Sequence, residues 1–597
     1  MTLPPSFEVV FQPDGRRGSF ASGTTVLEAA RELGVDINAI CGGAASCGKC
    51  IIKITGGSDD LSAPAPEELS QLGQRSLDEG FRLACRTRIR GYTAVLVPEE
   101  SRTGTQRLQT EGLDTPVRFE PLVTRQTRDG ITTVFLGDEP LETHRSDDHP
   151  ILGFAVDVGT TKIAGYLMDL STGEVLSVEA APNPQIAFGE DIISRLSYAL
   201  KGESQRSALH RSLVDSIGRL LAKACARADV TPQDVYEQVY VGNTAMQHFL
   251  LDIDPEPLTH SPFKPENPEH RDVDPASLGL GNPRGNIHVL PVIDGFVGAD
   301  CVAAILATGV HRDDETCFLI DIGTNTEVVV GNRERMIACS CASGPAFEGA
   351  HIGHGMRAAS GAIEGVWIDQ DDLEPKLKTI DGAEPVGICG SGLIDALSEM
   401  LRTGIIDTSG RIREEIGHPR IRRSGDTLEY VLVWRDDSAT EEDIVLSQLD
   451  VRELQKGKAA MFSGAQIAME KLGATPVDFD KVYMAGAFGT YINRESAVNV
   501  GMIPEFQLSK ILQVGNAAGT GARMALISRS AREEAKEIGR SVDYVELAAQ
   551  PEYNQAYLDA LLFPHRDLSL FPETVKRLSR ENLMVSRMHR RTRGRAL

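Results

Sequence analysis

The sequence predicts a multidomain protein of α/β and α+β class, in which a small cysteine-containing domain precedes a larger, internally duplicated body. Three observations lead to this prediction. The chain has 597 residues, which is too long for a single core and indicates three or four domains. Four cysteines near the N-terminus are spaced like the ligands of one metal cluster. Two similar strand–turn–strand segments, around Asp157 and Asp321, each open an α/β pattern.

The cysteine motif is Cys41-x5-Cys47-x2-Cys50, and Cys85 follows at a distance. This spacing is typical of plant- or adrenodoxin-type ferredoxins, in which four thiolates hold a [2Fe–2S] cluster. Thiolates are soft ligands that suit iron, and the glycines of the loop let the backbone curl around a cluster. A zinc site is the alternative, but such sites usually pair two Cys-x2-Cys knuckles, and only one occurs here. The motif therefore predicts a one-electron carrier.

The patterns around the cysteines predict alternating strands and helices. The helix should begin at Thr24 or Thr25 and end at Gly34. The expected elements are a strand at 7–11, a helix at 25–34, a strand at 51–55, a helix at 66–77 and a strand at 92–97. This is the order of a β-grasp ferredoxin, so residues 1–97 are predicted to form a [2Fe–2S] ferredoxin-like domain.

Residues 98–149 are rich in Arg, Thr, Asp, Glu and Pro and contain only short apolar runs. We expect a linker that carries one strand pair or a small ordered piece. A flexible chain of about 50 residues has a root-mean-square span of about 35–45 Å, so the ferredoxin could visit two partners.

An α/β pattern begins near residue 150 and occurs twice. An apolar strand ends in Asp157-x-Gly159-Thr160, and a second strand follows; the same arrangement returns at Asp321-x-Gly323-Thr324. Two copies predict two facing lobes, at 150–310 and 311–597. In each turn the glycine lets backbone N–H groups approach a phosphate, and the threonine adds a donor. Each aspartate is placed to hold Mg²⁺ through water or to orient the attacking water.

Further glycine-rich turns complete the predicted ATP site. The turn after strand 481–485 suits adenosine, and the helix start near Gly390 suits phosphate or ribose. No GxxxxGK[ST] motif is present, so this is not a P-loop protein. Asp157 and Asp321 are the predicted catalytic residues. The predicted ATP contacts are Gly159, Thr160, Thr161, Gly323, Thr324, Asn325, Gly390, Ser391, Gly486, Ala487, Phe488 and Gly489.

Two further side chains have two interpretations each. Lys162 could contact a phosphate, or it could equally be an exposed lysine of the hairpin. Glu348 could polarise water, and a structural carboxylate is the equal alternative.

Composition restricts the class of partner. The formal net charge is −24, which argues against a nucleic-acid-binding protein. The N-terminus has no signal-peptide pattern and no stretch of 18 apolar residues occurs, so we expect a cytoplasmic protein without a membrane span. The other six of the ten cysteines are expected to be reduced, buried thiols.

In this order, the segments resemble the acetate and sugar kinase, heat-shock protein 70 and actin (ASKHA) superfamily, which has a duplicated RNase H-like fold with two lobes. The hinge-like connecting motifs fall at Gly242–Met246 and Val514–Gly521. A [2Fe–2S] ferredoxin in front of this fold resembles the ATP-dependent reductive activators of corrinoid proteins. The resemblance extends through Asn183–Arg195, Pro291–Asp300, Ala342–Gly349 and Asp450–Ala459, and Asp294 departs from the alanine expected there.

The resemblance implies an enzyme that couples ATP to electron transfer. The cluster would pass one electron to a corrinoid protein of a methyltransferase system whose cobalt is in the inactive Co(II) state. ATP binding and hydrolysis would accompany the transfer and restore Co(I). An upstream electron donor is implied, and a homodimer is compatible with the resemblance.

Three other functions remain open at this point. The first is an ATP-driven electron donor to a radical dehydratase or reductase, but these relatives typically hold a [4Fe–4S] cluster between two subunits. The second is a chaperone- or actin-like nucleotide switch that uses the ferredoxin as a redox sensor. The third is a kinase that phosphorylates a small acceptor, which would give a phosphorylated product and no free phosphate.

Overall fold

The structure is a computed structural model and divides into two compact units, residues 1–106 with 184–201 and residues 107–183 with 202–597. The residues that it describes are 5–12, 16–33, 35, 37, 39, 43, 45, 48–57, 60–98, 101, 117–146, 149–486 and 489–578.

The first unit contains a five-stranded sheet with the strand order β2-β1-β5-β3-β4. Strands β1 and β5 are parallel at its centre, and β1 forms an antiparallel hairpin with β2. Its elements are β1 (Ser6–Gln12), β2 (Arg16–Ala21), α1 (Val26–Glu32), β3 (Ile51–Gly56), α2 (Pro66–Asp78), β4 (Phe81–Leu83) and β5 (Thr93–Leu96). This topology is that of a β-grasp fold. The sequence patterns did not predict β2 and β4.

Helix α1 begins where the sequence predicts it. Thr25 is the N-cap: its hydroxyl accepts a hydrogen bond from the Glu28 backbone N–H, and the Glu28 carboxylate accepts one from the Thr25 N–H. This reciprocal capping satisfies two N–H groups that the first turn leaves without partners. The first unit also includes η3 (Pro184–Phe188) and α3 (Ile192–Ala199).

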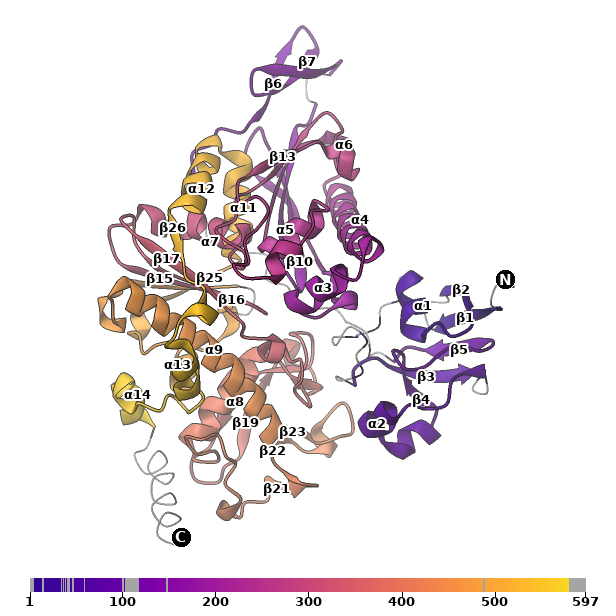
Figure 1. The fold of residues 1–597 in the computed structure, drawn as a ribbon, viewed down its shortest axis with the longest axis vertical. Coiled ribbons are helices and arrows are strands. Elements are labelled where there is room, and N and C mark those ends of the chain that lie inside the picture. The colour runs from indigo at the N-terminus through magenta and orange to yellow at the C-terminus, as the bar shows by residue number, and fades with distance from the viewer. Residues whose placement is uncertain are drawn as a thin grey trace. The chain divides into compact units, whose positions relative to one another are not determined.

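The interval expected to be a linker is largely ordered. It contains a three-stranded antiparallel sheet of β6 (Val123–Arg128), β7 (Ile131–Leu136) and β8 (Glu139–His144). Val123 and Val134 are fully buried and belong to the core of the second unit. The ordered piece that the sequence allows in this interval is therefore a three-stranded sheet, because the apolar residues of these strands have a core to pack against. In Figure 1, the labels β6 and β7 mark this sheet.

Two six-stranded sheets form the body of the second unit. The first has the order β11-β10-β9-β12-β14-β13, and the second has the order β17-β16-β15-β24-β25 with β26 beside β17. In each sheet the first three strands along the chain are antiparallel. Two further strands continue the sheet in parallel, β12 and β14 in the first sheet and β24 and β25 in the second, whereas β13 pairs antiparallel with β14. The first sheet comprises β9 (Leu152–Val158), β10 (Lys162–Asp169), β11 (Val175–Pro182), β12 (Val235–Gly242), β13 (Arg271–Val273) and β14 (Asn286–Val289). The second comprises β15 (Cys317–Ile322), β16 (Thr326–Gly331), β17 (Met336–Cys341), β24 (Lys481–Ala485), β25 (Ile511–Gly515) and β26 (Val542–Tyr544).

The shared strand order means that the chain repeats one folding unit, as the two D-x-G-T turns predict. Smaller sheets are added to the second copy: β18 (Ala362–Ile368), β19 (Pro375–Thr379) and β20 (Gly387–Ile388), and β21 (Ile421–Ser424), β22 (Thr427–Val433) and β23 (Ile444–Ser447).

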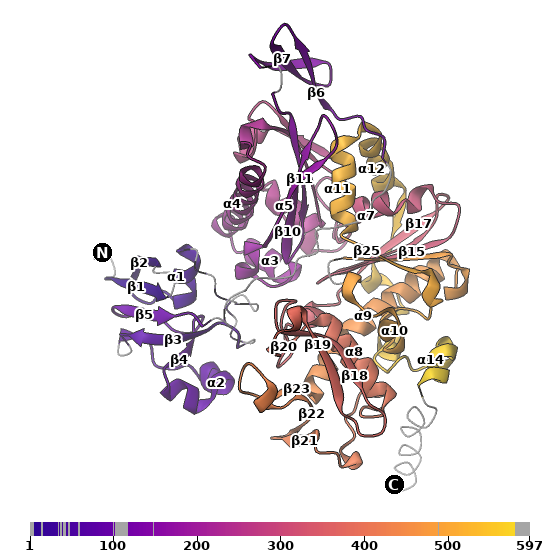
Figure 2. The ribbon, with the colours of Figure 1, turned by 180° about the vertical axis from the view of Figure 1, so that it is seen from behind.

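Helices from the end of the chain return to the first sheet. Helix α11 packs against β9, β12 and α7, and one hydrophobic core includes buried residues of both large sheets. Figures 1 and 2 both show α11 and α12, in yellow, beside the magenta strands of the first sheet. The helices are α4 (Glu203–Arg227), α5 (Thr244–Leu250), α6 (Pro275–Leu278), α7 (Ala299–Thr308), α8 (Gly390–Arg402), α9 (Gln448–Leu472), α10 (Arg494–Asn499), α11 (Ala517–Ile527), α12 (Arg529–Ser541), α13 (Tyr553–Ala560) and α14 (Pro572–Arg577).

Among the described residues, no helix is both long enough and apolar enough to cross a bilayer. The six cysteines outside the predicted cluster motif are all buried and form no disulfide, as expected for reduced thiols.

Candidate nucleotide pocket and cluster site

The two D-x-G-T turns face each other across a cavity in the second unit. The turn between β9 and β10 carries Thr161, the turn between β15 and β16 carries Thr324, and the two hydroxyl oxygens lie 2.9 Å apart. The cavity encloses about 210 Å³, and both turns line it. The duplicated motifs thus converge on one site although 164 residues separate Asp157 from Asp321 along the chain.

Two glycines allow the backbone to pass closely through this site. A Cβ atom at Gly159 would lie 2.6 Å from the Lys162 carbonyl oxygen, so only glycine fits the turn. Gly486, with φ of +92°, lies where a Cβ would be 2.4 Å from the Ile322 carbonyl oxygen and 2.8 Å from Asp321 Oδ1. A side chain at either position would push apart the elements that form the pocket.

Four carboxylates line one wall: Asp157 at the end of β9, Asp300 in the first turn of α7, Asp321 on β15 and Glu327 on β16. Burial raises the pKa of Asp157 to about 6. Burial, and then the charge of Asp157, raise the pKa of Asp300 to about 7. Burial and the charges of Asp300 and Asp157 raise the pKa of Asp321 to about 8. The pKa of Glu327 is raised too, by burial and then by Asp300. Gathered, desolvated carboxylates of this kind suit a hard divalent cation.

Amide side chains hold two members of the site in place. Asn516 Nδ2 donates to Asp157 Oδ2 over 2.8 Å, and Asn516 is also the N-cap of α11. Asn243, the N-cap of α5, donates from Nδ2 to Thr160 Oγ1 over 2.9 Å. The two predicted connecting segments therefore each supply one positioning amide.

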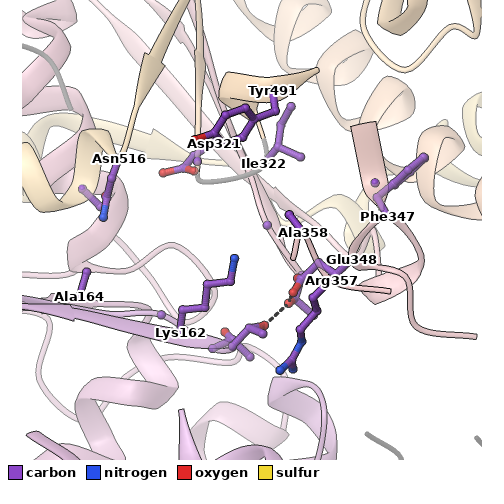
Figure 3. Close-up of a pocket in the computed structure, with 18 of the residues that line it drawn as sticks. Lys162, Ala164, Asp321, Ile322, Phe347, Glu348, Arg357, Ala358, Tyr491 and Asn516 are labelled. Carbon is purple, nitrogen blue, oxygen red and sulfur yellow. Dashed lines mark hydrogen bonds between the residues drawn. The ribbon is translucent and has the colours of Figure 1, made fainter. Parts of the chain in front are cut away.

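A basic side chain reaches the cavity from β10. Figure 3 shows Lys162 extending into the pocket, with Glu348 and Arg357 on the facing side. Burial lowers the pKa of Lys162, and Glu348 partly offsets this effect. Thr324 donates from Oγ1 to Glu348 Oε1 over 2.5 Å. Lys162 is thus a half-buried residue that lines the pocket, and the alternative of an exposed hairpin lysine is wrong.

The cysteine site is described in part. Cys50 and Cys85 are buried in one core, with exposed fractions of 1% and 5%. Strand β4 brings Cys85 close to Cys50. It pairs with β3, where Leu83 lies opposite Ile51, and the Ala84 N–H donates to the Cys50 carbonyl over 2.8 Å. Two thiols brought together beside one loop fit a thiolate-ligated cluster. Cys41 and Cys47 lie outside the described residues.

A solved structure of a reductive activator for a corrinoid iron–sulfur protein matches this chain from end to end. The two are 32% identical with a TM-score of 0.71, and the match covers 95% of this chain and all of the other. The chain belongs to the family of reductive activators of corrinoid proteins. This membership and the strand order confirm the predicted fold class, a ferredoxin domain followed by a two-lobed ASKHA body.

Family models match the successive parts of the chain. They describe a 2Fe–2S iron–sulfur cluster binding domain at residues 11–90, a RACo middle region at 152–313 and a C-terminal RACo ASKHA domain at 315–575. The corrinoid activation enzyme RamQ of Eubacterium limosum is 29% identical, over 90% of this chain and 96% of its own length. A Methanosarcina barkeri protein named as a reductase of a Co(II) methylated amine-specific corrinoid protein is 26% identical, over 69% and 77%.

The structure brings most of the activator's predicted ATP contacts together. Gly489 is buried at the start of η12 (Gly489–Tyr491) and is not among the lining residues, whereas Tyr491 is. Ala487 and Phe488 lie outside the described residues. The predicted residues that line the pocket are Asp157, Gly159, Thr160, Thr161, Asp321, Gly323, Thr324, Asn325, Gly390, Ser391 and Gly486.

Sequence reasoning missed two of the four carboxylates. Glu327 pairs with Asp321 across the β15–β16 hairpin, so the six-residue spacing around a tight turn could have revealed it. Asp300 comes from α7 in the other lobe, and no local signal indicates that its carboxylate joins this wall.

Proposed function

We propose that this chain reduces the cobalt of an inactive Co(II) corrinoid protein to Co(I) and couples the transfer to ATP, thereby reactivating a methyltransferase system. The observation that carries the proposal is the end-to-end match to a solved reductive activator, which includes both the cysteine domain and the ASKHA body. The names of the Eubacterium limosum and Methanosarcina barkeri relatives support the same class of substrate.

Cys41, Cys47, Cys50 and Cys85 would hold the [2Fe–2S] cluster, which supplies one electron at a time. The burial of Cys50 and Cys85 supports this assignment because a low-dielectric, protein-enclosed site keeps the ligands from solvent. The ferredoxin-like part, proposed to span residues 1–97, would then be the donor to the partner protein.

Asp157 and Asp321 would hold Mg²⁺, directly or through water, with Asp300 and Glu327 completing an acidic wall. A bound Mg²⁺ supplies positive charge against which the ATP phosphates are oriented. The backbone N–H groups of 159–161 and 323–325 would take the phosphates from the two lobes.

The direct contact between Thr161 and Thr324 suggests how ATP acts on the protein. Their hydroxyls are within hydrogen-bond distance, so a phosphate chain held by both turns must replace this bond with its own oxygens. The two lobes, proposed as 150–310 and 311–597, would thus take one relative arrangement with ATP and another without it. Differential binding of the Co(II) partner to one arrangement is the way in which ATP can favour an uphill transfer. A one-electron gap of about 200 mV costs about 5 kcal/mol.

The test uses dithionite-reduced protein mixed with a Co(II) corrinoid protein, with and without ATP. The Co(I) absorption band is expected only with ATP. Asp157→Ala and Asp321→Ala should keep the cluster spectrum and lose ATP-dependent Co(I) formation; full activity in both variants would refute the two-lobe clamp. The upstream electron donor, the cytoplasmic location and the homodimer stay predictions.

The electron-donor and nucleotide-switch alternatives have less support. An electron donor to a radical dehydratase would not need the Cys-x5-Cys-x2-Cys loop, and a nucleotide switch would not need a match to an activator over the whole chain. Reduced protein that fails to reduce any Co(II) corrinoid protein, but changes nucleotide affinity with cluster oxidation, would favour the switch.

A further inference from the structure

A second cluster of ligand-type side chains lies outside the nucleotide pocket. Glu142 and His144 come from β8, and His149 comes from the segment that leads into β9. All three residues belong to the second unit. One ligand atom from each of them lies within 4.8 Å of the other two, and none of the three lines the nucleotide cavity.

The two imidazoles are stacked, with ring centroids 3.5 Å apart and planes 11° from parallel. The Nε2 atoms of both rings contact the Tyr236 hydroxyl, at 3.1 Å from His144 and 2.9 Å from His149. His144 Nε2 is also 3.1 Å from Glu142 Oε1. Tetrahedral zinc with ligands at 2.0–2.1 Å has neighbouring ligand atoms about 3.3 Å apart, so His144 Nε2 and Glu142 Oε1 are close to that spacing. Because an imidazole binds a metal in the plane of its ring, one of the two stacked rings must turn out of the stack when the ion binds.

A fourth ligand and an outer shell are present nearby. Asp234 Oδ1 lies 4.0 Å from His149 Nε2. Asn282 Nδ2 donates to Glu142 Oε1 over 3.1 Å, and Asn282 is itself buried. A buried amide that fixes the orientation of a carboxylate is typical of the outer shell of metal sites. The three ligand side chains and Asp234 are between 16% and 28% exposed, so an ion can enter without unfolding the site.

The hydrogen bonds made without metal place a hydrogen on each Nε2 that would bind the ion. The Tyr236 hydroxyl donates its single proton to Glu142, so each Nε2 that faces this hydroxyl must carry a hydrogen and donate to its oxygen. A neutral imidazole needs only to move its hydrogen to Nδ1 to present a lone pair to a metal.

We propose that Glu142, His144 and His149 form a binding site for one divalent transition-metal ion, with Zn²⁺ as the best match to two imidazoles and a carboxylate. Asp234 or a water molecule would complete the tetrahedron. The site links β8 to the segment before β9 and to the start of β12. Zinc would therefore fasten the β6–β8 sheet to the first large sheet, as a structural site that takes no part in electron transfer.

The experiment titrates Co²⁺, as a spectroscopic substitute for Zn²⁺, into full-length protein whose cluster is loaded. Excess Mg²⁺ is present to occupy the carboxylates of the nucleotide pocket. Tetrahedral Co²⁺ bands without thiolate charge-transfer bands are expected at one equivalent, and Zn²⁺ should abolish them. The His144→Ala/His149→Ala double variant should bind at least 100-fold more weakly, and Glu142→Gln at least tenfold more weakly.

His260→Ala is the matched control, because His260 is exposed and is not one of the three grouped side chains; this variant should bind Co²⁺ as the unchanged protein does. The visible cluster spectrum and nucleotide binding report that each variant is folded. The proposal is overturned if the unchanged protein gives no tetrahedral Co²⁺ spectrum. This result does not depend on whether the double variant folds. It is also overturned if a folded double variant keeps the same affinity.

Discussion

Magnesium binding to the nucleotide pocket is expected to release protons, because the carboxylates that would receive the ion hold protons near neutral pH. The pKa values of Asp157, Asp300 and Asp321 are raised to about 6, 7 and 8 by burial and mutual repulsion. The cation favours the ionised forms, so protons must leave as it binds. We therefore expect the Mg²⁺ affinity to depend on pH. The variant Asp321→Asn removes the carboxyl with the highest of the three pKa values.

The size of the effect follows from these three values. Together the carboxylates hold about 1.5 protons at pH 7 and about 0.6 at pH 8. The slope of log affinity against pH equals the number of protons released. From these three groups alone, Mg²⁺ affinity should therefore rise about tenfold, or about 1.4 kcal/mol, between pH 7 and pH 8, and the raised pKa of Glu327 can only add to this rise. Between pH 6 and pH 7 the rise should be about a hundredfold, since about two protons are then displaced on average.

Isothermal titration with Mg²⁺ in two buffers of different ionisation enthalpy measures both the affinity and the protons released. Asp321→Asn should lose most of the rise between pH 7 and pH 8. Asp436→Asn, at a carboxylate whose side chain is 94% exposed, should keep it. An affinity that is independent of pH from 6 to 8, or equal proton release from all three proteins, would refute the assignment of these carboxylates to the cation.

The same raised pKa values determine how stability depends on pH without the ion. Between about pH 4 and pH 8 the unfolded chain loses these protons while the folded chain keeps them, so the folded state becomes less stable as pH rises. The melting temperature of metal-free protein should fall over this range, and the gain on adding Mg²⁺ should grow. Gly159→Ala places a Cβ 2.6 Å from the Lys162 carbonyl oxygen, so nucleotide affinity should drop at least tenfold while the cluster spectrum is unchanged. Cys85→Ala should abolish the cluster spectrum and leave nucleotide affinity unaltered. Asn516→Ala removes the 2.8 Å bond to Asp157, which should raise the pKa of that carboxyl and shift the Mg²⁺ profile to higher pH.

These outcomes separate the two functional parts of the chain. A cluster spectrum lost in Gly159→Ala, or a nucleotide affinity lost in Cys85→Ala, would mean that the two parts do not fold independently. A Mg²⁺ profile in Asn516→Ala that is identical to that of the unchanged protein would show that the amide has no influence on Asp157.

The features that depend on short-range spacing could be predicted from the sequence. The Cys41–Cys50 loop and the two turns at Asp157 and Asp321 are encoded in a few consecutive residues, since glycine and the neighbouring side chains specify the turn and the ligands together. Repetition of the Asp-x-Gly-Thr turn was enough to predict two lobes, and the order of five strands that the two large sheets share agrees with it.

Which distant residues share a site could be seen only in the folded structure. Asp300 joins the acidic wall because α7 packs between the two large sheets, and Cys85 reaches Cys50 because β4 pairs with β3. The sheet β6–β8, which carries Glu142 and His144, is ordered because Val123 and Val134 enter a core built from residues much later in the chain. These outcomes depend on long-range burial of apolar surface, and local sequence patterns do not record which surface will receive it.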